Sequence, residues 1–458
     1  MRLIQRLQLF LRPAQVETKQ ADELAEIGRI LDRAPGIKEI FEEVLQEVNH
    51  GKSSKTGRDG LTAEQIVRLG ILRARTGASY RGLEHMTADS LSVRAFLNLA
   101  PGVGLKKSSI NSNLKCVSEA TWRKINDCIK GVALSDGMED GKSLRGDTTT
   151  TKTNIHHPTD ASLLFDSVRV LTRTINRLKG WCGVEVKSTD HYRRAKKRLF
   201  KINNTHKEGV RRENYLELIR VTRMTLGYAE NAVEILKTSK LVDIELLPTL
   251  LALEGALKHY IPLVKQVIDQ AHRRIVKGEN VPVSEKIFSI FEPETDIIIK
   301  GQRDIVFGHK VFLTTGKSSL IFRVETLDGN PADSSLVQQA LKEHKEYYKY
   351  APTDAAFDGG FASVANRDIA KAEGVTNITF SKNGNMPIDT LVTSTRKEKS
   401  LLRFRAGIEG CISFFKRIFG ATRILDRTKE TFKSVLQCSA VAYNLTLLAR
   451  FRLQKAAT

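Results

Sequence analysis

The spacing of apolar residues divides the chain into three parts. Residues 1–138 carry short stretches in which apolar side chains recur every three or four positions, and this predicts a series of amphipathic helices. One stretch, "LTAEQIVRLGILRARTG", has the signature of a helix start, because Thr62 can cap the first turn and Gln65 completes a capping box. Between about 165 and 290 the same periodicity continues over longer segments. We therefore expect helices at the start of the chain and again in its middle.

Strand patterns occupy the remaining parts. The first, "KSLRGDTTTTKTNIHHP", is rich in Thr and bounded by Gly and Pro, which predicts a strand that leads into a loop. After the middle helices we expect two strands, a helix capped by Asp333, a strand, a helix, another strand and closing helices. This order favours a mixed sheet with helices on its faces, an α/β fold. The predicted domains are helical over 1–138 and mixed α/β over 139–458, with an all-helical insertion at about 165–290. The later strand patterns are "DIVFGHKVFLTT", "SSLIFRVETLDG", "PTDAAFDGG" and "VTNITF".

The charge of the chain indicates what kind of partner it binds. Lys and Arg number 73 against 52 Asp and Glu, so the chain carries a net charge of +21. Such an excess indicates attraction to a polyanion, either nucleic acid or an anionic membrane surface, and nucleic acid is favoured because no apolar run is long enough to span a bilayer. The start, "MRLIQRLQLFLRP", is a poor secretory signal because Arg interrupts it. The cysteines form no CxxC pair, which argues against disulfides and for a cytoplasmic protein. The first helices fit either a helix-turn-helix DNA reader or a plain helical bundle.

Two aspartates stand where predicted strands end. Asp147 lies in "RGDTTT", and Asp358 lies in "AAFDGGF", where glycines let the chain turn sharply. Ligand sites of α/β sheets gather at strand ends, and carboxylate oxygens are the ligands that Mg²⁺ prefers. Together with Glu409 on a later helix, these residues would hold Mg²⁺, or alternatively Mn²⁺, for in-line phosphoryl transfer. Taken singly, each aspartate could instead cap a loop.

Other residues compete for the role of metal ligand. Asp354 precedes Asp358 by four positions on the same predicted strand and shares its face, but the rise of a strand places it too far away to share one ion. A zinc cluster near the first aspartate is a further alternative, although such residues more often order a loop. Its members would be His156, His157, Asp160 and Asp166.

The segment "FRAGIEGCISFFKRIFG" places one carboxylate between two cations. At about 100° per residue, Arg405, Glu409 and Lys416 share one stripe of a helix, next to an apolar stripe suited to burial. The simplest interpretation is a solvated ion pair that contributes little to stability. The functional interpretation is that the two cations hold the phosphate backbone of DNA across a negatively charged metal site.

A second group of cations lies in "HYRRAKKRLFKINN", inside the predicted insertion. A run of this kind can neutralise several phosphates, and it can equally be a solvated helix face. Trp181, just upstream, is expected in the core rather than stacked on a base. The predicted DNA-contacting residues of this run are Arg193, Arg194, Lys196, Lys197, Arg198 and Lys201.

Several of these motifs resemble DDE-type insertion-sequence transposases. "RFRAGIEGCISFFKRIFG" is similar to their C-terminal signature, in which three residues separate Arg from Glu and six separate Glu from Lys; Leu402 stands where that signature has Tyr. "DTTTTKTNIHHPTDASLLFD" and "FDGGFASVANRDIAKAEGV" resemble the two aspartate blocks of the ISNCY group. The segments "FGHKVFLTT", "GNPADSSL" and "YRGLEHMTADSLSVRAFLNL" look like other parts of it. Some relatives carry an insertion between the second Asp and the Glu, whereas here the extra material follows Asp147.

The resemblance implies an RNase H-like catalytic fold in which Asp147, Asp358 and Glu409 are the metal ligands. It implies an enzyme that binds double-stranded DNA, at the terminal inverted repeats of its mobile element, as a homodimer or higher homo-oligomer. Such an enzyme cleaves DNA by metal-assisted hydrolysis and transfers the 3′ ends to target DNA, here in a bacterial cytoplasm at the nucleoid. Two alternatives remain: a non-catalytic DNA-binding protein or repressor derived from a transposase, and an RNase H-like nuclease that cuts without joining.

Overall fold

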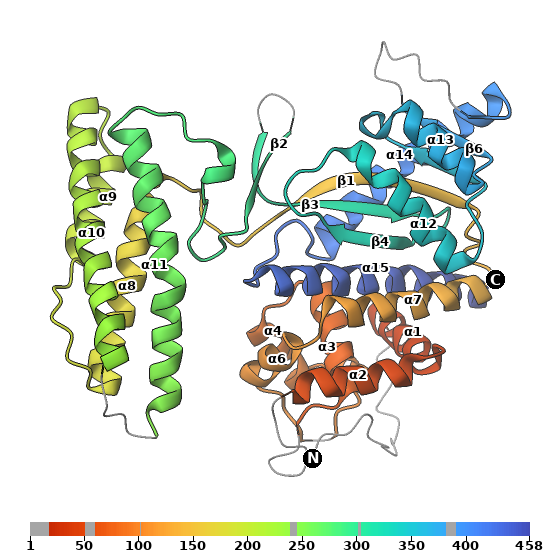
Figure 1. The fold of residues 1–458 in the computed structure, drawn as a ribbon. Coiled ribbons are helices and arrows are strands. Elements are labelled where there is room, and N and C mark those ends of the chain that lie inside the picture. Colours follow the sequence, from red (N-terminus) through yellow and green to blue (C-terminus); the bar gives the residue numbers. More distant parts are fainter. Residues whose placement is uncertain (1–17, 51–59, 101, 239–244, 301–303, 382–390) are drawn as a thin grey trace. The chain divides into compact units, whose positions relative to one another are not determined.

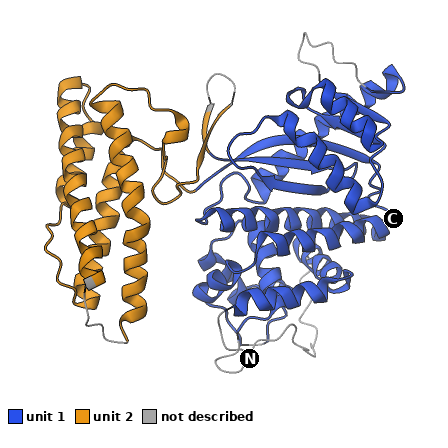
Figure 2. Ribbon diagram, in the orientation of Figure 1, with its two compact units in different colours: residues 1–153, 308–458 blue, residues 154–307 orange. Residues whose placement is uncertain are grey.

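The chain forms two compact units, which Figure 2 colours separately. Unit 1 joins Met1–Thr153 to Gly308–Thr458, and unit 2 is the intervening segment Asn154–Phe307. Unit 1 combines helices with most of a sheet, and unit 2 is largely helical (Figure 1). The computed structural model describes residues 18–50, 60–100, 102–238, 245–300, 304–381 and 391–458.

The first part of unit 1 is helical, as the apolar periodicity predicted. Thr62 caps α3 (Ala63–Thr76) by accepting a hydrogen bond from the Gln65 N–H at 3.1 Å. The Gln65 side chain accepts from the Thr62 N–H in return, so the predicted capping box is confirmed. Gly77 ends the helix in the left-handed conformation that glycine favours. The other helices here are α1 (Lys19–Arg33), α2 (Ile37–Asn49), α4 (Tyr80–Asp89), α5 (Leu91–Phe96), α6 (Lys107–Leu114) and α7 (Glu119–Ser135).

The described residues form the predicted mixed sheet, with six strands. The order is β2-β3-β1-β5-β6, and β4 pairs with β3 off this path. β1 runs antiparallel to β3 and parallel to β5, and β6 is parallel to β5. Two strands distant in sequence, β1 and β5, are therefore neighbours. The bounds are β1 (Ser143–Lys152), β2 (Asp296–Lys300), β3 (Asp304–Thr315), β4 (Ile321–Thr326), β5 (Asp354–Phe357) and β6 (Asn377–Phe380).

Helices cover both faces of the sheet in unit 1. Side chains alternate along β3, so Phe312 enters an apolar cluster with α12, whereas Leu313 enters a different cluster that contains α15. α14 packs on β1, β5 and β6. The bounds are α12 (Val337–Tyr348), α13 (Val364–Glu373), α14 (Thr395–Ile418) and α15 (Lys429–Ala457), with short 3₁₀ helices η2 (Asp333–Leu336) and η3 (Gly359–Phe361).

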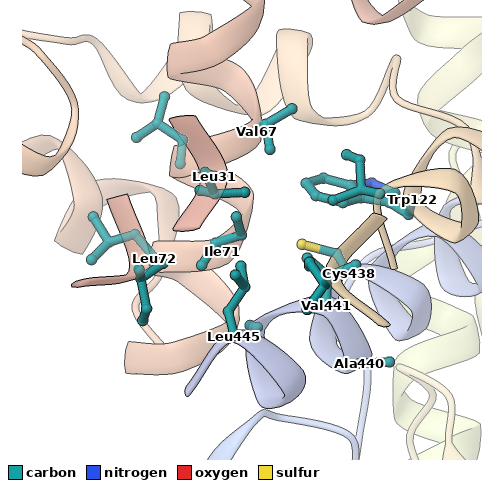
Figure 3. Packing of buried hydrophobic residues seen from close by; sticks show 14 of the residues in the cluster. Leu31, Val67, Ile71, Leu72, Trp122, Cys438, Ala440, Val441 and Leu445 are labelled. Atoms are coloured by element: carbon teal, nitrogen blue, oxygen red, sulfur yellow. The ribbon is translucent and has the colours of Figure 1, made fainter. Parts of the chain in front are cut away.

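One apolar core joins the first helices to the sheet. α15 packs against α3, α7 and β4. Figure 3 shows Ile71 of α3 and Trp122 of α7 beside Cys438 and Val441 of α15. Burial of the apolar faces of these helices against α15 is what places the region 1–138 in the same compact unit as the sheet.

Unit 2 has an apolar core of its own. Leu171, Leu218 and Leu257, from three different helices, are fully buried together in it. Thr159 caps the first helix of the unit by accepting a hydrogen bond from the Ser162 N–H. In the part of the chain that the structure describes, no helix has the length and apolar character needed to cross a membrane. The helices of the unit are α8 (Asp160–Cys182), α9 (Tyr192–Asn203), α10 (Glu208–Thr238) and α11 (Leu247–Ile275), followed by the 3₁₀ helix η1 (Val283–Glu285).

Candidate active site

Asp147 and Asp358 lie beside each other where the parallel pairing of β1 with β5 ends. Asp358 follows β5 directly, as predicted, whereas the expectation that Asp147 stands at a strand end is wrong, because pairing with β3 continues β1 to Lys152. In the β1–β5 register Gly146 pairs with Phe357, the last residue of β5, so Asp147 inside β1 and Asp358 just after β5 are the next residues along the two segments. The backbone of Asp358 is still extended, so the two aspartates occupy equivalent positions and point to the same face. Leu313, the β3 partner of Asp147, is buried on that face in the core that contains α15. The two predicted aspartates are thus brought together by strand order and register.

Arg145 fixes α14 onto the same face. Its nearly buried side chain donates to the carbonyl oxygen of Phe404 at 2.6 Å, to Thr315 Oγ1 at 2.8 Å and to Ser319 Oγ at 2.9 Å. The guanidinium also lies over the Phe404 ring, 4.7 Å from its centroid. Burial lowers the pKa of Arg145, and these contacts compensate for the water that the cation has lost. α14 is thereby held across β1 and β5.

The close approach of α14 depends on Gly407. A Cβ there would overlap Nη1 of Arg145, which its hydrogen bonds hold in place, whereas a Cβ on Gly410 would meet no atom within 4 Å. We expect Gly407→Ala to lower the free energy of unfolding by about 1–3 kcal/mol, because the overlap forces a shift in a packed contact. The matched Gly410→Ala should raise it by up to about 1 kcal/mol, the helix preference of Ala over Gly. Urea denaturation of both variants measures the two changes, and changes of equal sign and size would contradict this packing.

Both ends of α14 are also tied to the sheet. Near its start, Lys397 forms an ion pair with Asp354 of β5, which also accepts a hydrogen bond from Asn377 at 2.9 Å. Near its end, Lys416 donates from Nζ to the carbonyl oxygen of Thr150 at 2.7 Å. Asp354, the alternative ligand, is therefore engaged in attaching the helix. The predicted contact of Lys416 with DNA stays a prediction.

Arg405 lies between Asp358 and Glu409. Its Nη1 is 3.3 Å from Asp358 Oδ1, and its Nη2 is 3.4 Å from Glu409 Oε1. The Arg405 side chain is 17% exposed, whereas that of Glu409 is 67% exposed. Among the described residues, Nε of Arg405 is buried and has no hydrogen-bond partner. The ion pair that the helix spacing predicted is present, and it extends to Asp358, so the two carboxylates share one guanidinium.

The environment of Asp147 makes its ionised form costly. Burial raises the pKa of Asp147 to about 6, and the charges of Asp358 and Asp333 act in the same direction. The N–H of Thr148, 2.7 Å from Asp147 Oδ1, and the charge of Arg405 act in the opposite direction and offset only part of this rise. A bound cation would lower this cost by pairing with the carboxylate.

Asp333 is a site residue that sequence reasoning missed. The expectation that it caps a helix is wrong, because its side chain makes no capping bond. Asp333 instead accepts from Thr148 Oγ1 at 3.1 Å and pairs with Lys310 at 2.8 Å. Its Oδ2 lies 2.9 Å from where a Cβ on Gly360 would be, so it also contacts the loop after Asp358. The sequence did show that Asp333 is an acidic residue after a predicted strand. It could not show that Asp333 contacts β1, because that contact depends on the order of the strands in the sheet.

The carboxylates do not form a complete metal site as they stand. Among the residues that the structure describes, no three His, Cys, Asp or Glu side chains lie close enough together to hold one ion. Glu409 is separated from Asp358 by the guanidinium of Arg405. The alternative zinc cluster is not formed either, because Asp166 pairs with Arg169 at 2.7 Å and with His156 at 3.4 Å. The structure therefore groups the two aspartates and leaves Glu409 outside.

The predicted DNA-contacting run lies on α9 in unit 2. Arg194 forms an ion pair with Glu217, and Arg198 donates to Asn214 Oδ1 at 3.2 Å, so both of these cations connect α9 to α10. The remaining cations of the run are exposed and form no ion pair with any described residue, which leaves their charge available to a polyanion. These are Arg193, Lys196, Lys197 and Lys201.

Comparison with known proteins identifies no relative. No protein-family model matches the chain, and neither a curated protein nor a solved structure matches it. The resemblance to DDE transposases therefore depends on the sequence motifs alone.

Proposed function

We propose that this chain is a DDE-type DNA transposase with an RNase H-like catalytic domain in unit 1. The observation that supports it best is that Asp147 and Asp358 lie side by side where the parallel pairing of β1 with β5 ends, next to the helix that carries Arg405 and Glu409. Three segments far apart in sequence meet there. They are the same three segments that carry the transposase-like motifs.

The donor atoms of this site suit a hard divalent cation such as Mg²⁺ or Mn²⁺. When bound, such ions activate water or a 3′-hydroxyl and stabilise the leaving oxygen of a phosphodiester. Asp147 and Asp358 would hold the cation, which would lower the cost of ionising the buried Asp147. Glu409 would join them after Arg405 releases it. The released guanidinium would then be available to a DNA phosphate.

DNA recognition would use charge outside the catalytic site. The net charge of +21 and the exposed cations of α9 support binding to a duplex, and strong dependence on salt follows from that. In this proposal the chain acts as a homo-oligomer at the nucleoid. It brings the terminal inverted repeats of its element together and joins their 3′ ends to target DNA.

A direct experiment uses the DNA that flanks the coding region. Purified full-length protein is incubated with linear fragments of this DNA in Mg²⁺, Mn²⁺ or EDTA, and the expected result is cleavage at the repeat ends that requires the metal ion. Pre-cleaved ends incubated with a supercoiled plasmid should then be joined to it. Protein that binds the fragments without cutting them contradicts the proposal. Cutting without joining favours the nuclease.

One observation favours a second candidate, a non-catalytic DNA-binding protein or repressor derived from a transposase. Arg405 occupies the space between Asp358 and Glu409, and such a protein could retain this ion pair permanently. Isothermal calorimetry with Mg²⁺ separates the two candidates. Specific binding that Asp358→Asn removes supports the enzyme, and DNA binding without metal binding supports the repressor.

A further inference from the structure

A groove runs along the outer side of α8 in unit 2. Its wall on the helix carries three arginines and a tryptophan, and the segment that leads into α9 contributes the other wall. The groove lies within one unit, so its shape does not depend on where unit 1 lies. The lining residues that matter here are Arg169, Arg173, Arg177, Trp181, Asp190 and Tyr192.

Trp181 presents its ring to solvent. The expectation that it belongs to the core is wrong, because Trp181 is 56% exposed. The buried face of α8 ends at Leu178, and Trp181 lies beyond it in the last turn of the helix. The guanidinium of Arg177 lies 4.9 Å from the centre of the ring. An exposed aromatic ring with a cation against it is an arrangement on which unpaired bases stack.

The arginines follow α8 at intervals of four residues. Arg169, Arg173 and Arg177 are therefore about 6 Å apart along the helix axis, similar to the spacing of phosphates along one nucleic-acid strand. Arg173 and Arg177 are exposed and form no ion pair with any described residue, and Arg169 pairs with Asp166. Asp190 is the one acidic group in the lining, and it accepts a hydrogen bond from the Tyr192 N–H at 2.8 Å. The lining is thus positively charged beside an open aromatic ring.

We propose that this groove binds single-stranded DNA, with one base stacked on Trp181 and the backbone held by Arg173 and Arg177. Single strands are favoured over a duplex because only an unpaired base can leave its neighbours to stack on the indole. The site goes beyond the catalytic proposal: it uses no residue of unit 1 and requires no metal ion. A protein that fails to cleave DNA would therefore not contradict the proposed single-strand site.

Tryptophan fluorescence provides the readout. The chain has two tryptophans, and Trp122 is 1% exposed within unit 1, so a ligand in the groove should quench the emission of Trp181 alone. Full-length protein without metal is titrated with an oligothymidine of about 16 nucleotides, the upper size that one single-strand site covers. The same strand paired with its complement serves as the duplex ligand. We expect the single strand to quench the emission, and Trp181→Leu to remove the quenching.

Variants separate stacking from general charge attraction. Trp181→Leu should weaken single-strand binding about tenfold, as loss of a stacked base does, whereas Trp181→Phe should retain most of the affinity. Duplex affinity, measured by anisotropy, should change less than twofold in both. Arg177→Gln should weaken single-strand binding more than Arg223→Gln, which removes an exposed charge of α10 outside the groove. Unchanged single-strand affinity in Trp181→Leu, an equal loss for duplex, or saturation without quenching would overturn the proposal.

Discussion

Asp358→Ala is expected to reduce metal-dependent DNA cleavage by at least about a hundredfold while DNA binding persists. Replacing even an indirect partner of a metal ion typically costs 10–100-fold, and Asp358 is a proposed direct ligand. The Asp358 side chain is 48% exposed and makes no capping bond to the 3₁₀ helix that follows it, so among the described residues its replacement removes only the hydrogen bond from Ser381 Oγ at 2.9 Å and the ion pair with Arg405. Rates of strand cleavage and affinities for the same fragment, both measured on the variant, separate catalysis from binding.

Asp354→Asn is the matched control for this loss. Asp354 lies on the same strand and face as Asp358, but it is engaged with Lys397 and Asn377. Cleavage by Asp354→Asn should remain within a few-fold of the parent. Glu409→Ala should behave like Asp358→Ala, even though Glu409 is mostly exposed and its loss disturbs no core contact. Cleavage that survives in Asp147→Ala, Asp358→Ala and Glu409→Ala would rule out these carboxylates as the catalytic set.

Local features of the fold could be predicted from the sequence because a few neighbouring residues determine them. The capping box of Thr62 and Gln65 requires only that these two residues stand three positions apart at the start of a helix. Likewise, the residues around Asp358 correctly placed it at the end of a strand, whereas Asp147 was expected at a strand end and lies inside β1, because pairing with β3 continues that strand to Lys152. The local sequence could not predict that β1 and β5 are neighbours in register, because this depends on the order of the whole sheet.

The sequence could not predict contacts between side chains that lie far apart in the chain. Asn444, on the last helix, is fully buried: it accepts from the Ile321 N–H and donates both to the carbonyl oxygen of Ile321 and to Asn126. These bonds join α15 to β4 and α7, and nothing in the local pattern distinguishes this Asn from a surface residue. Asp333 and Lys416 were placed by sequence on helices, but their contacts with β1 come from the tertiary fold.

The second large effect concerns stability. Asp147→Asn should raise the melting temperature at pH 7.5 by several degrees, because the buried carboxylate has a pKa of about 6, above the value of about 4 expected in the unfolded chain. A raised pKa means that the folded state binds the proton more tightly. Stability from this group is therefore present below pH 4 and is lost as the pH rises through 6, a loss of up to about 3 kcal/mol. Asn keeps the acceptor for the Thr148 N–H without the charge. The benefit of the substitution should accordingly disappear at pH 4.

Magnesium links this stability effect to the proposed site. At pH 7.5 a divalent cation should neutralise Asp147 and Asp358 and raise the melting temperature of the parent protein, because binding to the folded state alone stabilises it. In Asp147→Asn the buried carboxylate that the ion would neutralise is absent and a ligand is lost, so the same concentration of Mg²⁺ should have little effect. Scanning calorimetry at pH 4 and 7.5, with and without Mg²⁺, tests both points. An equal response to Mg²⁺ in the two proteins would mean that the ion binds elsewhere, and a lower melting temperature for Asp147→Asn at pH 7.5 would mean that the carboxylate is neutralised by contacts other than these.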